Sequence, residues 1–148
     1  MAWLDLVKAF DSVPHRFLVE AAIRHGFNLW ILRMSLDAYR FERRLSADGC
    51  FSEPLIATRS LIAGSTSATT ELRVLFLDLL DEAAAMSPLA DLSVYVDDTS
   101  VDAVGDEESA SLEVERVTDF LCDGFARMGM EVSASKGHVM ASRVAIGA

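Results

Sequence analysis

The sequence predicts an α+β fold, in which helices pack on one face of an antiparallel sheet. Hydrophobic residues make up 51% of the 148 residues, which is enough for a folded core. Stretches with the apolar spacing of helices alternate with short runs of strand-forming residues. Two such runs are interrupted by tight-turn residues, which is typical of antiparallel hairpins. We expect a single domain over residues 1–148.

The first part of the chain predicts one strand and two helices. An apolar run at the start of the chain reads as a buried strand that ends near Asp5. A helix is predicted over residues 13–27, with Gly26 as its end signal. A second helix is predicted over residues 28–40, because Asn28 is a favoured N-cap residue in front of an apolar stripe.

The middle of the chain predicts two hairpins around a long helix. Residues 43–59 resemble two short strands joined by the turn Asp48-Gly49, a strong hairpin signal. Residues 67–86 have helical spacing. The second hairpin covers residues 92–104, and we expect its turn to carry two adjacent aspartates.

The last part predicts an amphipathic helix and one or two strands. The helix spans residues 106–129 and has acidic residues in its first turn, where the helix dipole favours them. Its expected core stripe is Leu112, Val117, Phe120, Leu121 and Phe125. Residues 130–143 supply the final strands. The predicted element order is therefore β-αα-ββ-α-ββ-α-β(β).

Charge and composition restrict the class of protein. The net charge is −10, which on its face argues against binding to phosphate-rich nucleic acid. The apolar runs are too short to span a bilayer, and Asp5 and Lys8 interrupt any apolar leader, so we expect no membrane association. Cys50 and Cys122 stand far apart without metal-ligand spacing, which favours thiols in an intracellular, reducing compartment.

Three carboxylates are candidates for one metal site. Asp5 ends the first strand, and Asp97 and Asp98 lie at the second hairpin. If these strands are neighbours, all three reach the same edge of the sheet. Magnesium prefers oxygen ligands, and two such ions can promote nucleotidyl transfer. The alternative is that Asp97 and Asp98 serve only as turn residues.

Several motifs carry a family resemblance. They are "WLDLVKAFDSVPH" (residues 3–15), "YVDD" (residues 95–98) and "GMEVSASKGHVMAS" (residues 129–142). Together they resemble the palm domain of reverse transcriptases, of the type found in non-LTR retrotransposons. The hairpin of residues 43–59 also resembles the stretch that precedes the family's middle motif. The first two motifs are specific as a pair, whereas either alone is weak.

The resemblance implies a fold and an activity. The fold would be the ferredoxin-like antiparallel sheet of a polymerase palm. The activity would be RNA-directed DNA polymerisation by two Mg²⁺ ions, with Mn²⁺ as a substitute. The partners implied are an RNA template, a DNA primer and deoxynucleotides, and the implied location is the cytoplasm or nucleus.

The resemblance also implies catalytic and metal-binding residues. Asp5 and Asp97 would bind the two Mg²⁺ ions, with Asp98 beside them. The backbone carbonyl of Leu6 would complete a metal site.

Three further residues would contact the nucleotide. Phe10 would lie under its sugar and exclude a 2′-hydroxyl, although it also fits a plain core position. Gly64 would allow close approach of the nucleotide, although a loop glycine with positive φ is an equal alternative. Lys136 would lie near the phosphates, although it also reads as a solvated surface lysine.

The chain departs from the family pattern at the middle motif, where Ala63 replaces the usual Gln. We also expect the basic fingers and the thumb to be missing, which would reconcile the acidic charge with a polymerase origin. The chain alone would then be inactive. The main alternative is an inactive palm relic that acts only as a folded binding module. An RNA-dependent RNA polymerase is a third reading, which Phe10 and the residues before the aspartate pair disfavour.

Two other sets of polar residues have structural explanations. Asp11 lies close to Asp5 but is expected to cap the following helix rather than to bind a metal. Arg43, Arg44 and Arg59 are expected to form a solvated edge rather than a nucleic-acid contact.

Overall fold

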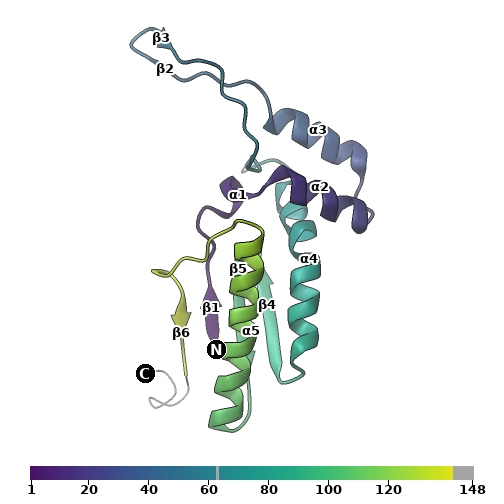
Figure 1. Cartoon of the computed structure of the whole chain (residues 1–148), viewed down its shortest axis with the longest axis vertical. Helices are drawn as coiled ribbons and strands as arrows, with labels where there is room; N and C mark the ends of the chain where they lie inside the picture. The colour runs from purple at the N-terminus through teal and green to yellow at the C-terminus, as the bar shows by residue number, and fades with distance from the viewer. Residues whose placement is uncertain (63, 142–148) are drawn as a thin grey trace. The chain divides into compact units, whose positions relative to one another are not determined.

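The computed structural model describes residues 1–62 and 64–141 (Figure 1). Ala63, and Ser142 at the end of the third motif, therefore lie outside the described residues. Contacts divide the chain into two compact units. The first unit contains Met1–Ala9 and the chain from Phe76 onward, and the second contains Phe10–Leu75. The expectation of one domain over residues 1–148 stays a prediction.

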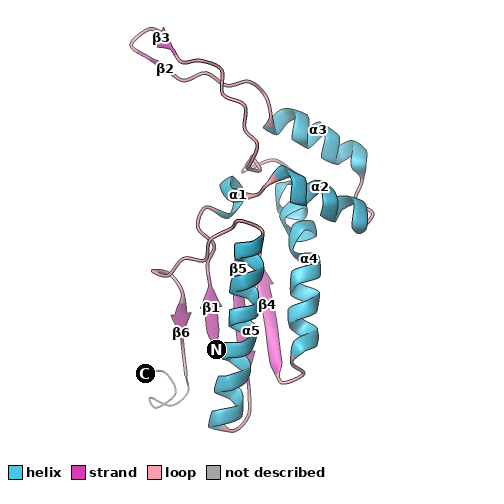
Figure 2. Ribbon diagram, viewed as in Figure 1, coloured by secondary structure: helices cyan, strands magenta, loops and turns pink. Residues whose placement is uncertain are grey.

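The first unit is built on a four-stranded antiparallel sheet, drawn in magenta in Figure 2. Its strands are β1 (Ala2–Leu4), β4 (Ala90–Tyr95), β5 (Asp98–Ala103) and β6 (His138–Val139). The order across the sheet is β4-β5-β1-β6, so β1 lies between two strands from the far end of the chain. The predicted α+β class is confirmed.

The second predicted hairpin is confirmed, with its turn shifted by one residue. Val96 and Asp97 form the turn between β4 and β5. Asp98 is the first residue of β5 and pairs with Tyr95. The prediction that both aspartates lie in the turn is therefore wrong for Asp98. Its backbone continues the pairing of β4 with β5, which the turn-forming tendency of aspartate does not predict.

Helix α5 (Glu107–Arg127) packs on strands β5 and β4. Asp106 is its N-cap and accepts a hydrogen bond from the Ser109 amide at 3.0 Å. Val117, Leu121 and Phe125 are buried, as predicted. The other two residues of the predicted stripe differ: Phe120 is half-buried and Leu112 is 59% exposed. Leu112 lies outside the core because the buried face of α5 comes from later turns of the helix.

Helix α4 (Ala68–Met86) begins in the second unit, and its part from Phe76 onward contacts α5 in the first unit. The Phe76 and Phe125 rings meet edge to face, with centroids 5.2 Å apart. A Cβ at Gly124 would lie 2.2 Å from Cδ1 of Leu79. A side chain at position 124 would therefore force the Leu79 side chain to shift.

The second unit contains two confirmed helices and a shorter unpredicted one. They are α1 (Ala9–Ser12), which begins at the unit boundary, α2 (His15–Arg24) and α3 (Leu29–Tyr39). Asn28 caps α3 as predicted, since its side chain accepts hydrogen bonds from the next helix turn at 3.0 and 3.3 Å.

The prediction that Asp11 caps the following helix is wrong. Asp11 lies within α1, and the N-cap of α2 is Pro14, with no side-chain cap. The extra turn of helix in α1 takes Asp11 away from the start of α2. Its exposed carboxylate is left with no capping role.

The first predicted hairpin is confirmed as β2 (Ser46–Ala47) and β3 (Cys50–Phe51). Its turn residues Asp48 and Gly49 both have positive φ, of 49° and 78°. This is the geometry of a tight type I′ hairpin turn.

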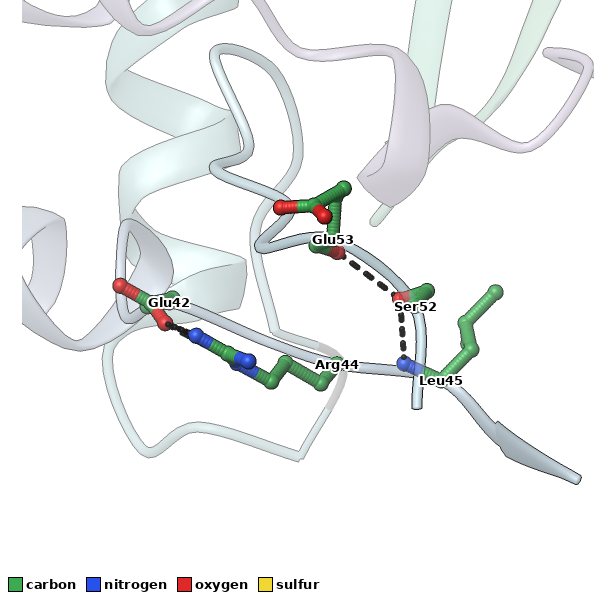
Figure 3. Close-up of polar contacts among 5 residues, drawn as sticks. All are labelled: Glu42, Arg44, Leu45, Ser52 and Glu53. Atoms are coloured by element: carbon green, nitrogen blue, oxygen red, sulfur yellow. Dashed lines mark hydrogen bonds and ion pairs between the residues drawn. The ribbon is translucent and has the colours of Figure 1, made fainter. Parts of the chain in front are cut away.

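Figure 3 shows the polar contacts at the base of this hairpin. The Leu45 amide donates to Ser52 Oγ at 3.0 Å, and Ser52 Oγ donates to the Glu53 carbonyl at 2.8 Å. Arg44 forms an exposed ion pair with Glu42 at 3.1 Å.

Arginines 43, 44 and 59 are all exposed, as expected of a solvated edge. No described helix is both long enough and apolar enough to cross a membrane. Cys50 and Cys122 are free thiols.

Candidate functional site

The ends of two neighbouring strands bring three predicted carboxylates together. Leu4, the last residue of β1, pairs with Thr99 of β5 in antiparallel register. Asp5 directly follows Leu4 at the end of β1, and Asp98 directly precedes Thr99 on β5. Asp97, the residue before Asp98, lies in the turn. The condition that the sequence left open, that these strands are neighbours, is therefore met.

Electrostatics also links these carboxylates. Burial raises the pKa of Asp97, and the negative charges of Asp98 and Asp5 raise it further. Lys136 and a hydrogen bond from the backbone of Asp97 itself oppose this shift. Four of the predicted site residues therefore interact around one point of the first unit.

The loop between α5 and β6 forms hydrogen bonds with the segment that follows β1 and contains Asp5. The Ser133 amide donates to the Asp5 carbonyl at 2.8 Å, and the Val7 amide donates to the Glu131 carbonyl at 2.8 Å. These bonds flank an antiparallel bridge between Leu6 and Val132. The bridge uses the peptide groups of Asp5 and Val7, not those of Leu6, whose metal-binding role stays a prediction.

The same loop positions Lys136. The Gly137 amide donates to the Ser133 carbonyl at 3.0 Å, which closes the turn that contains the lysine. A Cβ at Gly137 would lie 3.3 Å from that carbonyl oxygen, so the turn is tight. Lys136 is thus held beside the first strand.

Lys136 forms an ion pair with Asp5. Its Nζ lies 3.1 Å from Asp5 Oδ2, with the lysine side chain 69% exposed and the aspartate side chain 17% exposed. Asp5 Oδ2 has no hydrogen-bond partner in the described part of the chain, so the Lys136 ammonium is its charge partner.

The turn that contains Asp97 has strained backbone geometry. Val96 has a φ of 61°, in the left-handed region that β-branched residues rarely adopt. Such strain costs of order 1–3 kcal/mol and concentrates at functional sites. A turn selected only for stability would favour glycine or asparagine here.

The donor chemistry fits a hard divalent cation. Mg²⁺ takes oxygen ligands and is usually held by one or two carboxylates, with water and phosphate oxygens completing its shell. Asp5, directly after β1, and Asp97, in the turn between β4 and β5, supply such oxygens, and Asp5 Oδ2 is buried beside the Lys136 ammonium. However, the residues that the structure describes contain no group of three or more His, Cys, Asp or Glu arranged to hold a metal. The Lys136 ammonium is the cationic partner of this site.

Two predicted nucleotide contacts lie in the second unit. Phe10 is half-buried, and its carbonyl accepts a hydrogen bond from the Leu61 amide at 2.7 Å. Gly64 is exposed with a φ of 93°, and a Cβ there would meet nothing within 4 Å. The positive φ agrees with the loop-glycine alternative, whereas the nucleotide roles of both residues stay predictions.

Sequence reasoning missed a buried polar network in the second unit. His15 is 1% exposed, and its Nε2 lies 2.8 Å from the Ser60 carbonyl. Arg40 Nε donates to His15 Nδ1 at 3.3 Å. These contacts require a neutral imidazole that donates through Nε2. Burial lowers the pKa of His15, and the Arg40 charge lowers it too, against the raising effects of Ser60 and Glu71.

Glu71 is the second missed member of this network. It is fully buried and accepts a hydrogen bond from the Tyr39 hydroxyl at 2.8 Å. Its position beside Ala68, Leu72 and Leu75 on the buried face of α4 was the available signal. A carboxylate within an apolar stripe needs a partner.

No protein-family model matches the chain, and no curated protein matches it.

Proposed function

We propose that the chain is the palm of an RNA-directed DNA polymerase of the reverse transcriptase type. In this proposal Asp5 and Asp97 hold two Mg²⁺ ions, and Asp98 adds negative charge beside them. The observation that carries it is the pairing of Leu4 with Thr99, which brings Asp5, the residue after β1, next to Asp98, the first residue of β5. Two metal ions can steady both the attacking and the leaving oxygen of nucleotidyl transfer, and carboxylates from two segments can hold them.

The chain's own residues have defined roles in this proposal. Bound Mg²⁺ would supply charge stabilisation for nucleotidyl transfer. Asp5 and Asp97 bind and orient it, and Lys136 contacts the nucleotide phosphates once it leaves Asp5. The nucleotide contacts of Phe10 and Gly64, which lie in the second unit, are proposed on the resemblance alone.

The proposed partners are an RNA template and a DNA primer. The net charge of −10 offers them little electrostatic attraction. We therefore expect the isolated chain to polymerise poorly or not at all. The cytoplasm or nucleus is the proposed location.

Titration with Mn²⁺, followed by electron paramagnetic resonance, tests the metal site. We expect the wild-type chain to bind Mn²⁺ and Asp97→Asn to bind at least about tenfold more weakly, because one of few carboxylates is lost. Asp81→Asn is the matched control, since Asp81 is an exposed aspartate on α4. Equal binding by the wild type and Asp97→Asn would sink the proposal.

A folded binding module without polymerase activity is the second candidate. Two observations favour it: Lys136 is paired with Asp5, and no three-ligand acidic group is arranged among the described residues. Primer extension with an RNA template separates the candidates. Product above the level of the Asp97→Asn variant would exclude the inactive module.

A further inference from the structure

One half of the helix-covered face of the sheet is open. Helix α5 packs on β5 and β4, whereas β1 and β6 complete the other half of the sheet (Figure 1). Beside the first half of α5, a groove of about 1010 Å³ reaches from the end of β5 to Ala2 of β1 and Val139 of β6. It lies entirely within the first unit.

The groove has apolar walls made of small and medium side chains. Ala110, Val114 and Thr118 form the α5 wall and recur at every fourth residue, so they lie on one helix face. Ala2 and Val139, which are register partners on β1 and β6, lie opposite them. Val139 is 65% exposed. Exposed apolar surface next to a helix face is typical of a docking site.

The wall also contains an unused polar atom. Thr118 Oγ1 is buried but has no hydrogen-bond partner in the described part of the chain. A buried hydroxyl without a partner is unfavourable.

The rim of the groove is acidic. Its five carboxylates are Asp102, Asp106, Glu107, Glu115 and Asp119. No Lys, Arg or His is found among the described residues that line it. The N-terminal ammonium, the one cation there, donates to the Met140 carbonyl at 3.1 Å. Hydrogen bonds from Ser109 lower the pKa of Asp106, which is therefore ionised at neutral pH.

We propose that this groove binds an amphipathic helix of a protein partner, whose apolar face fills the groove and whose flanking Lys and Arg side chains meet the carboxylate rim. A helix is the occupant because α5 already forms one wall, and a second helix beside it would extend the covering layer over β1 and β6. The rim selects a basic partner and repels nucleic-acid phosphates. This inference is independent of the proposed metal site.

A fluorescent amphipathic helical peptide of leucine and lysine, titrated by anisotropy, tests the proposal. We expect Glu115→Lys/Asp119→Lys to weaken binding at least about tenfold, because the rim attraction becomes repulsion. The control is Asp81→Lys/Glu82→Lys, which makes the same charge change at exposed α4 positions outside the groove. We expect the control to change the affinity less than about threefold.

A second pair of variants tests the apolar contact. Val139→Asp places a charge in the groove, and Leu112→Asp places one on an exposed α5 position outside it. Only Val139→Asp should weaken binding. Equal losses in the groove and control variants would show non-specific charge attraction and overturn the proposal. Unchanged binding in the groove variants, or self-association of the chain that the peptide does not reverse, would also overturn it.

Discussion

At the scale of single residues, Lys136 sets the charge balance of the candidate site. It is the cation in contact with Asp5, at 3.1 Å, and it lowers the pKa of Asp97. A divalent ion at the same carboxylates would repel the lysine ammonium. Metal binding and the ion pair should therefore compete.

Replacing Lys136 by methionine tests this competition. We expect Lys136→Met to bind Mn²⁺ about fivefold more tightly than the wild type, since a largely exposed ion pair contributes at most about 1 kcal/mol. Lys136→Arg keeps the charge and should bind like the wild type. If all three proteins bind equally tightly, the lysine does not compete; if none binds, the metal site itself is absent.

Asp97 should show opposite effects on metal binding and on stability. Its pKa is raised in the folded chain, so the folded state binds a proton more readily than the unfolded state. The favourable contribution is present at low pH and is lost as the pH rises above the unfolded value of 3.8. We therefore expect Asp97→Asn to raise the melting temperature at pH 7 and to have little effect at pH 3. A fall in melting temperature at pH 7 would contradict this.

At the scale of helices and strands, short sequence patterns predicted the structure correctly where the effect depends only on neighbouring backbone groups. Asn28 caps α3, acidic residues occupy the first turn of α5, and the turn Asp48-Gly49 joins β2 to β3. Each of these effects depends on atoms within a few residues.

Predictions failed where the answer depends on a distant segment. Leu112 has core spacing on α5 but remains exposed, because burial depends on where α5 meets the sheet. Asp98 resembles a turn residue but pairs with Tyr95 in the strand ladder. Glu71 is buried because Tyr39, from another helix, supplies its hydrogen bond. The Lys136–Asp5 pair joins segments 131 positions apart, so no local pattern reports it.

His15 gives the second unit a pH-dependent stability. Because its pKa is lowered in the folded chain, its favourable contribution is complete above the unfolded value of 6.5 and is lost as the pH falls below it. Hydrogen exchange of the α2 and α3 amides should show less protection at pH 5.5 than at pH 7.5. For one proton, the free energy of local opening can change by no more than about 1.4 kcal/mol per pH unit. His15→Gln should reduce this slope of opening free energy against pH, whereas His138→Gln, at an exposed position, should leave it unchanged. Equal slopes in both variants would assign the pH dependence to other groups.

A side chain at position 124 should clash with Leu79 where α4 contacts α5 and lower the stability of the chain. Gly124→Ala would place a methyl group 2.2 Å from Leu79 Cδ1. Overpacking of a core costs about 1–3 kcal/mol, which exceeds the gain of up to about 1 kcal/mol from better helix propensity. Urea unfolding should therefore show a lower free energy of unfolding, by up to about 2 kcal/mol when the full helix-propensity gain is realised.

Leu79→Ala offers the matched test of this clash. If the clash causes the loss, the double variant Gly124→Ala/Leu79→Ala should be less destabilised than the sum of the single variants. Additive losses would show that the two side chains do not interact.

At the scale of the whole molecule, the net charge limits the attraction that the chain can offer to nucleic acid. The chain has 13 Lys and Arg residues against 23 Asp and Glu residues. Three of its arginines, at positions 43, 44 and 59, are exposed in the second unit. One of them already pairs with Glu42.

Affinity for an RNA–DNA duplex should therefore be weak. Near 0.15 M salt we expect a dissociation constant of about 10⁻⁴ M or weaker, since even basic proteins bind non-specifically at about 10⁻⁴–10⁻⁶ M. Anisotropy of a labelled hybrid duplex measures it, and Arg43→Ala/Arg44→Ala should change it little. Micromolar binding that weakens steeply with added salt and is lost in this double variant would contradict the expectation. It would place a nucleic-acid contact on the hairpin, because a chain of net charge −10 can attract phosphates only where its few cations gather.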